Sequence, residues 1–129
     1  MIKIQPVNTT GAPQAIGPYS QAVIAGNLAF LSGQIPLVPD TMEIVDGDLQ
    51  AQARQVFTNL AAVIEACGST PADVVKLTIY LTDLSEFPRV NDMMSQFFRE
   101  PYPARATIEV SALPKGAQIE VDAIVALGS

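Results

Sequence analysis

Arg105 and Glu120 are the two residues of this chain whose types and positions are best suited to chemistry. Arg105 lies inside a predicted strand, where a rigidly held guanidinium can grip a carboxylate with two parallel hydrogen bonds. A salt bridge to Glu109, Glu120 or Asp122 would fit the same pattern. The residues alone leave both interpretations of Arg105 open.

Glu120 is expected to point away from the core, because its neighbours Ile119 and Val121 should point into it. A carboxylate on the opposite face, when partly dehydrated, can hold a proton near neutral pH and steer a water molecule. An ordinary surface glutamate, or a partner for Arg105, would produce the same pattern. Glu120 is therefore a candidate acid–base residue.

Two glycine-containing segments are weaker candidates for binding a ligand. In residues 17–20 a Gly-Pro pair fixes the chain before Tyr19 and can aim its hydroxyl group. Gly33, which follows Ser32 near a predicted strand end, would let a ligand approach the backbone N–H closely. A generic turn and an ordinary strand exit explain these segments equally well.

Composition excludes several kinds of chemistry. The chain has no histidine, which removes the Ser-His-Asp triad, the Cys-His pair and histidine-ligated zinc. Cys67 is the one cysteine, so no internal disulfide can form, and it lies on the apolar side of a predicted helix. Acid–base chemistry must therefore come from carboxylates, tyrosine, lysine or water.

The charge balance argues against nucleic acid as a partner. Seven Lys and Arg stand against 13 Asp and Glu, giving a formal charge of −6, and the basic residues form no run. Nucleic-acid binding depends on neutralising phosphates with such residues, so we expect none. No apolar run approaches the roughly 18 to 20 residues of a membrane span, and the start resembles no secretory signal. We expect a cytoplasmic protein without membrane association.

Two helices are predicted from apolar spacing. The clearer one covers residues 49–67, where apolar residues recur every three or four positions, with Asp48 as N-cap and Gly68 as C-terminal stop. The second is expected from about 86 to 98, with Ser85 as its cap. In both segments the apolar residues fall on one side of the helix, which is expected to pack against a core.

Strands surround these helices. Residues 21–25 and 28–32 are predicted to form a hairpin around a Gly-Asn turn, followed by a loop from 33 to 47. Further strands are expected at 73–82, 104–110 and 119–127, with a short first strand at 2–4. The order β-β-α-β-α-β-β predicts an α+β fold, a six-stranded mixed sheet with two helices on one face. We expect one domain over residues 1–129.

The last two strands predict which side chains lie on the open face of the sheet. In the strand 104–110, the alanine and isoleucine positions are expected to pack against the helices. This assignment places Arg105 and Thr107 on the open face, beside Glu120 and Asp122. Because that face also carries apolar side chains, we expect it to form contacts between subunits of a homo-oligomer.

A series of short segments, taken in order, resembles the Rid family of YjgF-type proteins and, within it, the RidA branch of enamine/imine deaminases. The segments are Ala15-Ile16-Gly17-Pro18-Tyr19-Ser20-Gln21, Ser32-Gly33-Gln34-Ile35-Pro36, Gln52-Ala53-Arg54-Gln55 with Asn59-Leu60, Asp73-Val74-Val75-Lys76 with Leu84, Val90-Asn91, Pro103-Ala104-Arg105, and Leu113-Pro114-Lys115 with Ile119-Glu120-Val121-Asp122-Ala123. Each segment is weak alone, and the ordered set is specific. The resemblance covers about residues 7 to 127.

The resemblance implies a chorismate-mutase-like fold and a homotrimer whose sheets form a central barrel, with sites in the clefts between subunits. It implies hydrolysis of 2-aminoacrylate and 2-iminobutanoate, in their imine forms, to 2-oxo acids and ammonia. It also implies that the reaction needs no cofactor and no metal.

On this resemblance, Arg105 holds the substrate carboxylate and Glu120 positions the attacking water. The expected pocket residues, some from a neighbouring subunit, are Tyr19, Ser32, Gly33, Asn91 and Thr107. Many RidA proteins have cysteine at the position of Thr107, so thiol-linked behaviour is in doubt here. The segment 98–103 is also shorter than usual, which leaves the substrate preference open.

Three other functions remain open. A binding or regulatory module for 2-oxo acids or similar carboxylates would use Arg105 in the same way and would not need Glu120. Ribonuclease activity or translation inhibition, labels often attached to this family, fits poorly with the acidic balance and the absent histidine. A chaperone-like role would depend on exposed apolar surface and not on the site residues.

Overall fold

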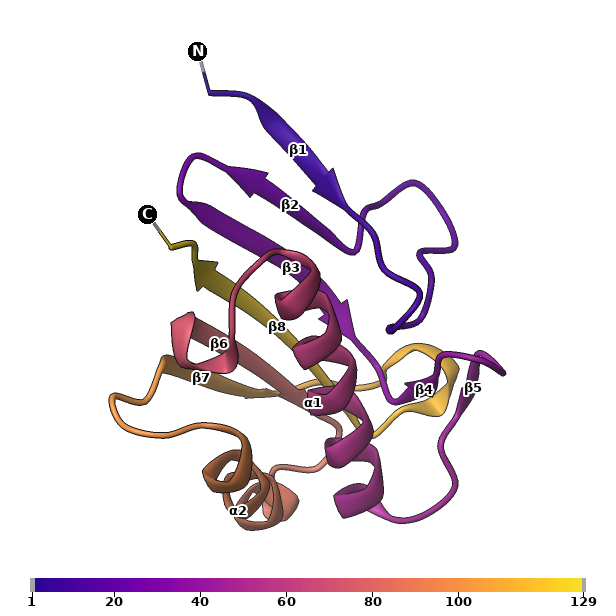
Figure 1. The fold of residues 1–129 in the computed structure, drawn as a ribbon. Helices are drawn as coiled ribbons and strands as arrows, with labels where there is room; N and C mark the ends of the chain where they lie inside the picture. The colour runs from indigo at the N-terminus through magenta and orange to yellow at the C-terminus, as the bar shows by residue number, and fades with distance from the viewer. Residues whose placement is uncertain (1, 129) are drawn as a thin grey trace.

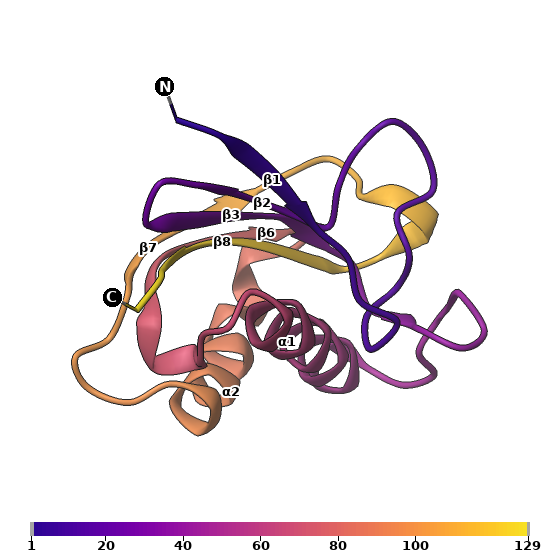
Figure 2. The ribbon, with the colours of Figure 1, turned by 45° about the horizontal axis from the view of Figure 1, so that its top comes forward.

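The computed structural model describes residues 2–128 as a six-stranded sheet with two α-helices packed on one of its faces (Figure 1). A turned view shows the two layers in profile, with the sheet above both helices (Figure 2). The strands of this sheet are β1 (Ile4–Val7), β2 (Ala22–Ala25), β3 (Leu28–Gln34), β6 (Val74–Leu81), β7 (Ala104–Glu109) and β8 (Ile119–Ala126). The helices are α1 (Leu49–Ala66) and α2 (Phe87–Phe97). The predicted α+β fold is confirmed.

The strands lie in the order β1-β2-β3-β8-β6-β7, and every neighbouring pair is antiparallel except β6 with β7. That parallel pair follows from the chain path, because α2 carries the chain from the end of β6 back to the start of β7. β8 lies inside the sheet and buries Val121 and Val125 completely. β7 is left at an edge, where it presents Arg105.

The predicted caps and apolar stripe account for α1. The Asp48 side chain accepts a hydrogen bond from Ala51 N at 3.1 Å, which satisfies one free N–H of the first turn. Gly68, with a φ of +84°, follows the helix end in the left-handed region that glycine tolerates. The buried side of the helix includes Ala53, Val56, Phe57, Leu60, Val63 and Ile64.

The start of α2 differs from the prediction. Ser85 does not cap the helix, because it lies in a short 3₁₀ turn, η2 (Leu84–Glu86), that precedes it. Asp83 Oδ1 caps this turn by accepting from the backbone N–H of Ser85 at 3.0 Å and from its hydroxyl at 2.7 Å. Glu86 then occupies the N-cap position of α2 without a side-chain hydrogen bond.

Parts of the sheet also differ from the sequence-based expectations. The first strand begins at Ile4 and not at residue 2. The expected loop contains a small hairpin of β4 (Leu37–Val38) and β5 (Glu43–Ile44), whose two-residue strands are too short to show alternation. On β6 the register shifts after Val74, so Val74 is buried and Val75, which was expected to face inward, is exposed.

The face predicted for the side chains of β7 is wrong. Arg105 and Thr107 pair in register with Leu77 and Ile79, which are fully buried between the sheet and the helices. Partnered residues on neighbouring strands share a face, so Arg105 and Thr107 point to the helix side, whereas Glu120 lies on the open face. The alternation gave the wrong face because β7 is an edge strand, whose apolar residues Ala104, Ala106 and Ile108 face outward.

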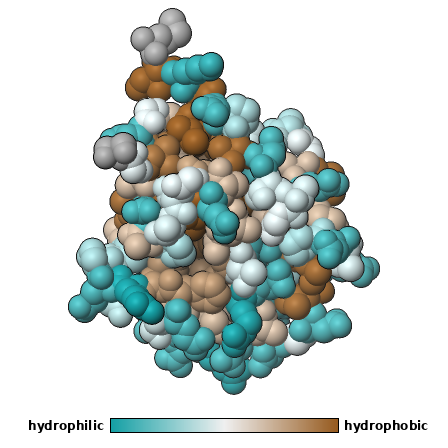
Figure 3. Space-filling view, in the orientation of Figure 1, coloured by the Kyte–Doolittle hydropathy of each residue, from teal (hydrophilic) through white to brown (hydrophobic). Residues whose placement is uncertain are grey.

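The two faces of the molecule differ in polarity. Figure 3 views the helix-bearing face, where hydrophilic side chains predominate over α2 and hydrophobic ones gather near the N-terminal strand. On the open face of the sheet, the large apolar side chains of Phe30 and Ile108 are 41% and 45% exposed. Among residues 2–128, no helix is both long and apolar enough to cross a membrane.

Candidate functional site

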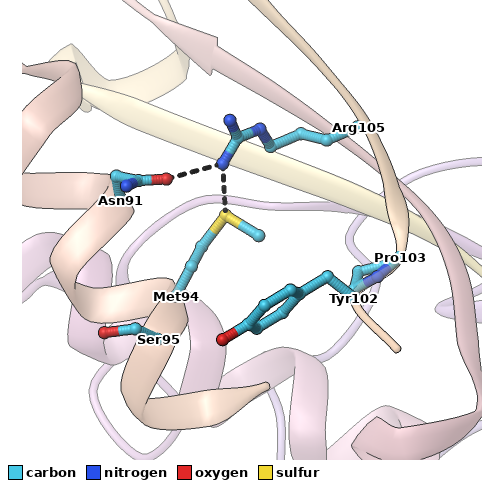
Figure 4. Close-up of a pocket in the computed structure, with 6 residues that line it drawn as sticks. All are labelled: Asn91, Met94, Ser95, Tyr102, Pro103 and Arg105. Carbon is cyan, nitrogen blue, oxygen red and sulfur yellow. Dashed lines mark hydrogen bonds between the residues drawn. The ribbon is translucent and has the colours of Figure 1, made fainter. Parts of the chain in front are cut away.

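The first part of the site is a pocket on the helix side of β7, which we call the Arg105 pocket (Figure 4). It has a volume of about 430 Å³ and is lined by Asn91, Met94, Ser95, Tyr102, Pro103 and Arg105. Arg105 Nη1 donates to Asn91 Oδ1 at 2.8 Å and contacts Met94 Sδ at 3.4 Å. The guanidinium carbon lies 4.7 Å from the ring centroid of Phe87, a cation–π geometry. These contacts fix the orientation of the guanidinium.

One side of α2 supplies these contacts. Phe87, Asn91 and Met94 are spaced by four and three residues, so they lie on the same face of the helix. The sequence pointed to Asn91 through the family resemblance and gave no functional role to Met94. Helical spacing from Asn91 is the signal that could have identified Phe87 and Met94 as its companions.

Arg105 keeps donors for a ligand. Among the described residues, its hydrogen bonds to protein groups use Nη1, which leaves Nε and Nη2 for a carboxylate. The ion pairs found in residues 2–128 join Arg89 to Asp48 and Glu86. The salt-bridge interpretation of Arg105 therefore does not hold within the described chain, and its pocket suits an anion.

The second part of the site is a cavity around Glu120, which we call the Glu120 chamber. Its volume is about 530 Å³, and Tyr19, Gly33, Lys115 and Glu120 contribute to its lining. Its apolar lining consists of Pro13, Ile16, Ile35, Leu37, Met42 and Pro114. The Glu120 carboxyl group thus faces a largely apolar space of the size that binds small organic molecules.

Gly33 lies against the Glu120 carboxyl group. A Cβ on Gly33 would come within 2.9 Å of Glu120 Cδ, closer than Cβ atoms normally approach a neighbour. The pairing of β3 with β8 shifts register here, so Ser32 and Gly33 bulge out of the ladder. The Ser32 hydroxyl donates to Ser20 O at 2.6 Å, which ties this bulge to the preceding loop.

The surroundings of Glu120 favour its protonated form. Burial raises the pKa of the Glu120 carboxyl group above its ordinary value, and the negative charge of Asp122 raises it further. Asp122 follows on the same face of β8, and its Oδ2 accepts a hydrogen bond from the Tyr80 hydroxyl at 3.0 Å. A carboxyl group with a raised pKa can exchange a proton closer to neutral pH.

Within one chain, the predicted site residues form two separate groups. Asn91 and Arg105 line the Arg105 pocket, whereas Tyr19, Gly33 and Glu120 line the Glu120 chamber. Because Arg105 and Glu120 lie on opposite faces of the sheet, the prediction that they share one polar face is wrong.

Some residues stand apart from these two groups. Ser32 and Thr107 line neither cavity; Ser32 supports the bulge, and Thr107 is half-buried beyond Arg105 on the helix side of β7. Lys115 borders the chamber, although the sequence singled it out only as part of a family motif. Residues 2–128 contain no group of three or more His, Cys, Asp or Glu side chains arranged to hold a metal ion.

Comparison with known proteins places the chain in a family. The profile of a family described as Endoribonuclease L-PSP matches residues 9–127. The chain belongs to this family, the YjgF or Rid proteins. This Rid chain is 48% identical over 121 residues to a protein of Dermatophagoides farinae named 2-iminobutanoate/2-iminopropanoate deaminase, and the match covers 94% of each chain.

Solved structures of Rid proteins share the fold. RidA from an Antarctic Psychrobacter matches with a TM-score of 0.92 and 47% identity, covering 95% of this chain and 99% of that one. TdcF of E. coli, determined with bound serine, matches with a TM-score of 0.90 and 39% identity, covering 96% and 99%. The predicted family is confirmed, and its members carry deaminase as well as endoribonuclease names.

Proposed function

We propose that this protein hydrolyses 2-imino acids, the imine forms of enamines such as 2-aminoacrylate, to 2-oxo acids and ammonia. The observation that carries the proposal is the Arg105 guanidinium, held by Asn91 and Phe87, with no hydrogen bond from Nε or Nη2 to any of residues 2–128. Such a group suits a small carboxylate. The deaminase name of a relative 48% identical supports the same chemistry.

The proposal requires two subunits, because Arg105 and Glu120 face opposite sides of the sheet in one chain. In a homotrimer with sites between subunits, Arg105 of one subunit would meet the Glu120 chamber of the next. The exposed apolar side chains of Phe30 and Ile108 on the open face are suited to burial between subunits. The homotrimer is therefore part of the proposal.

The proposed chemistry uses two positioned groups. Arg105 binds the substrate carboxylate and thereby directs C2 toward the neighbouring Glu120. Ionised Glu120 takes a proton from a water molecule as the water oxygen bonds to C2, and passes this proton to the imine nitrogen. In the resulting carbinolamine, Glu120 takes the hydroxyl proton and returns it to the amine as the C–N bond breaks. One water is consumed, and one ammonia and one 2-oxo acid leave.

The remaining predicted residues have supporting roles in this proposal. Gly33 leaves room for the Glu120 carboxyl group, and Asn91 orients the guanidinium. Tyr19 borders the chamber, where its hydroxyl can contact the substrate or the water. The role of Thr107 as a substrate contact stays a prediction.

A carboxylate-binding or regulatory module is the second candidate. The serine bound to TdcF favours it, because a small carboxylate can be bound without being turned over. Such a module would need Arg105 and not Glu120. Endoribonuclease activity, after which the family is described, requires a polyanionic substrate, for which 13 acidic against seven basic residues is an unfavourable balance.

The proposal is tested with imines generated in situ by a threonine or serine dehydratase, following 2-oxo acid release. The wild-type protein should accelerate release. Arg105→Ala should lower kcat/KM by about tenfold to a hundredfold, because the charged hydrogen bonds to the substrate carboxylate are lost. Glu120→Ala should abolish turnover while keeping carboxylate binding. A folded wild-type oligomer that binds carboxylates and gives no acceleration would favour the binding module.

A further inference from the structure

Two unusual turns form one wall of the Glu120 chamber. Met42, in the turn of the β4–β5 hairpin, has a φ of 59°, and Lys115, in the 3₁₀ turn η3 (Pro114–Gly116), has a φ of 57°. Within residues 2–128, these are the non-glycine residues with positive φ. Left-handed backbone is unfavourable for residues with a side chain and tends to occur at functional sites. Both turns must therefore be held by their surroundings.

The two turns hold each other. Lys115 Nζ donates to Met42 O at 3.2 Å, joining segments 73 residues apart, and both residues line the chamber with Glu120. Figure 1 shows the η3 turn, in yellow-orange, beside β4 and β5. The tip of the hairpin is thus fastened to the turn that leads into β8.

The helix α1 holds the same two segments from beneath. Asn59, fully buried on α1, donates from Nδ2 to Leu37 O at 2.9 Å, at the base of the hairpin. Gln52, seven residues earlier and also buried, accepts at Oε1 from Gln118 N at 2.9 Å, just after η3. These bonds give the Gln52…Asn59 motif a structural role. They fix the base of the wall to α1, while the Lys115 bond fixes its tip.

We propose that this wall recognises the side chain of the substrate, with Met42 as the specificity-determining contact and Lys115 as the residue that positions it. The inference rests on the proposed deaminase function. At about 530 Å³, the chamber is much larger than a four-carbon imino acid, whose short side chain therefore stays near Glu120. A longer, branched apolar side chain extends to the wall, where Ile35 and Leu37 lie beside Met42.

The experiment compares kcat/KM for 2-iminobutanoate and for the branched 2-imino-4-methylpentanoate, each generated in situ by an amino-acid oxidase. Met42→Ala removes the contact and leaves another L-residue at the same φ, so the backbone preference is unchanged. It should lower the ratio of branched to short substrate by about fourfold or more, as expected for at least one buried methylene. The kcat/KM for 2-iminobutanoate should fall less than that for the branched substrate.

Lys115→Met provides a second variant, because Lys115 is exposed and the change removes the donor while keeping a similar stem. The ratio of kcat/KM for the branched substrate to that for the short one should also fall. Glu43→Ala is the matched control, since Glu43 is exposed on the same hairpin and outside the chamber lining, and it should keep the wild-type ratio. The ratio is independent of the amount of folded enzyme, so a loss of folded protein alone does not change it.

The outcomes separate this inference from the proposed function. Wild-type ratios in both Met42→Ala and Lys115→Met, with deaminase activity intact, would overturn the role of the wall. A wild-type protein that accelerates the hydrolysis of neither imine would overturn the proposed function, and the inference with it.

Discussion

Gly33 has no Cβ, and the Glu120 carboxyl group occupies the space that a Cβ would need. Gly33→Ala should therefore push that carboxyl group aside. The fold should persist, because the displaced atoms are the end of a flexible side chain. We expect kcat for 2-iminobutanoate to fall by about tenfold to a hundredfold, as displaced catalytic groups do, with little change in the denaturation midpoint.

The control for this substitution is Gly11→Ala, whose new Cβ would meet ordinary contacts at 3.4 and 3.5 Å. It should keep both activity and stability. Full activity in Gly33→Ala would contradict the position assigned to Glu120.

Asp122 is expected to tune the pH dependence of the reaction. Its negative charge adds to burial in raising the pKa of the Glu120 carboxyl group. Asp122→Asn removes the charge and keeps an oxygen that can accept from the Tyr80 hydroxyl. The pKa of Glu120 should then fall. Because ionised Glu120 acts as the base and activity is lost as the pH falls through its pKa, the acid limb of kcat/KM should move to lower pH.

The pH profile of kcat/KM for 2-iminobutanoate measures this shift. Tyr19, Tyr80 and Lys115 also lie near Glu120 and are unchanged in the variant. Asp40→Asn, an exposed change of the same charge, should leave the acid limb in place. An acid limb that does not move in Asp122→Asn would contradict the role given to Asp122.

Among the elements, α1 supports the wall of the Glu120 chamber through Asn59 and Gln52, and it depends on its N-cap. Asp48→Ala removes the hydrogen bond to Ala51 N and should lower the free energy of unfolding by about 1 kcal/mol. The exposed contact of Asp48 with Arg89, at 3.8 Å, should add little. Chemical denaturation measures the change, with the exposed Asp46→Ala as control; equal stability of the two variants would contradict the capping role.

The elements that could be predicted from the sequence are those with a long periodic signal. The stripe of α1 and the Gly-Asn hairpin of β2 and β3 were identified because tertiary packing and local preference agree there. The face of β7 was not predicted correctly. Alanines and Ile108 alternate there with Arg105 and Thr107, and an edge strand can bury either side. The bulge at Ser32 and Gly33 could not be predicted, because the sequence there shows no periodic pattern that marks it.

At the scale of the whole molecule, Arg105 and Glu120 were singled out from the sequence, but their placement relative to each other was predicted wrongly. Both are charged residues within predicted strands, and this can be read from the sequence. Their placement on opposite faces follows from the register of β6 with β7 and with β8, a long-range pairing that no local pattern records. In the proposed function one chain supplies two half-sites, and the reaction therefore depends on assembly.

Mixing two impaired variants tests this claim most directly. Arg105→Ala and Glu120→Ala chains are unfolded together, refolded as mixed oligomers, and assayed for hydrolysis of 2-iminobutanoate. If each site takes Arg105 from one subunit and Glu120 from the next, a random equal mixture should regain about a quarter of the wild-type activity. A mixture that assembles and shows no more activity than Arg105→Ala alone would contradict a site shared between subunits.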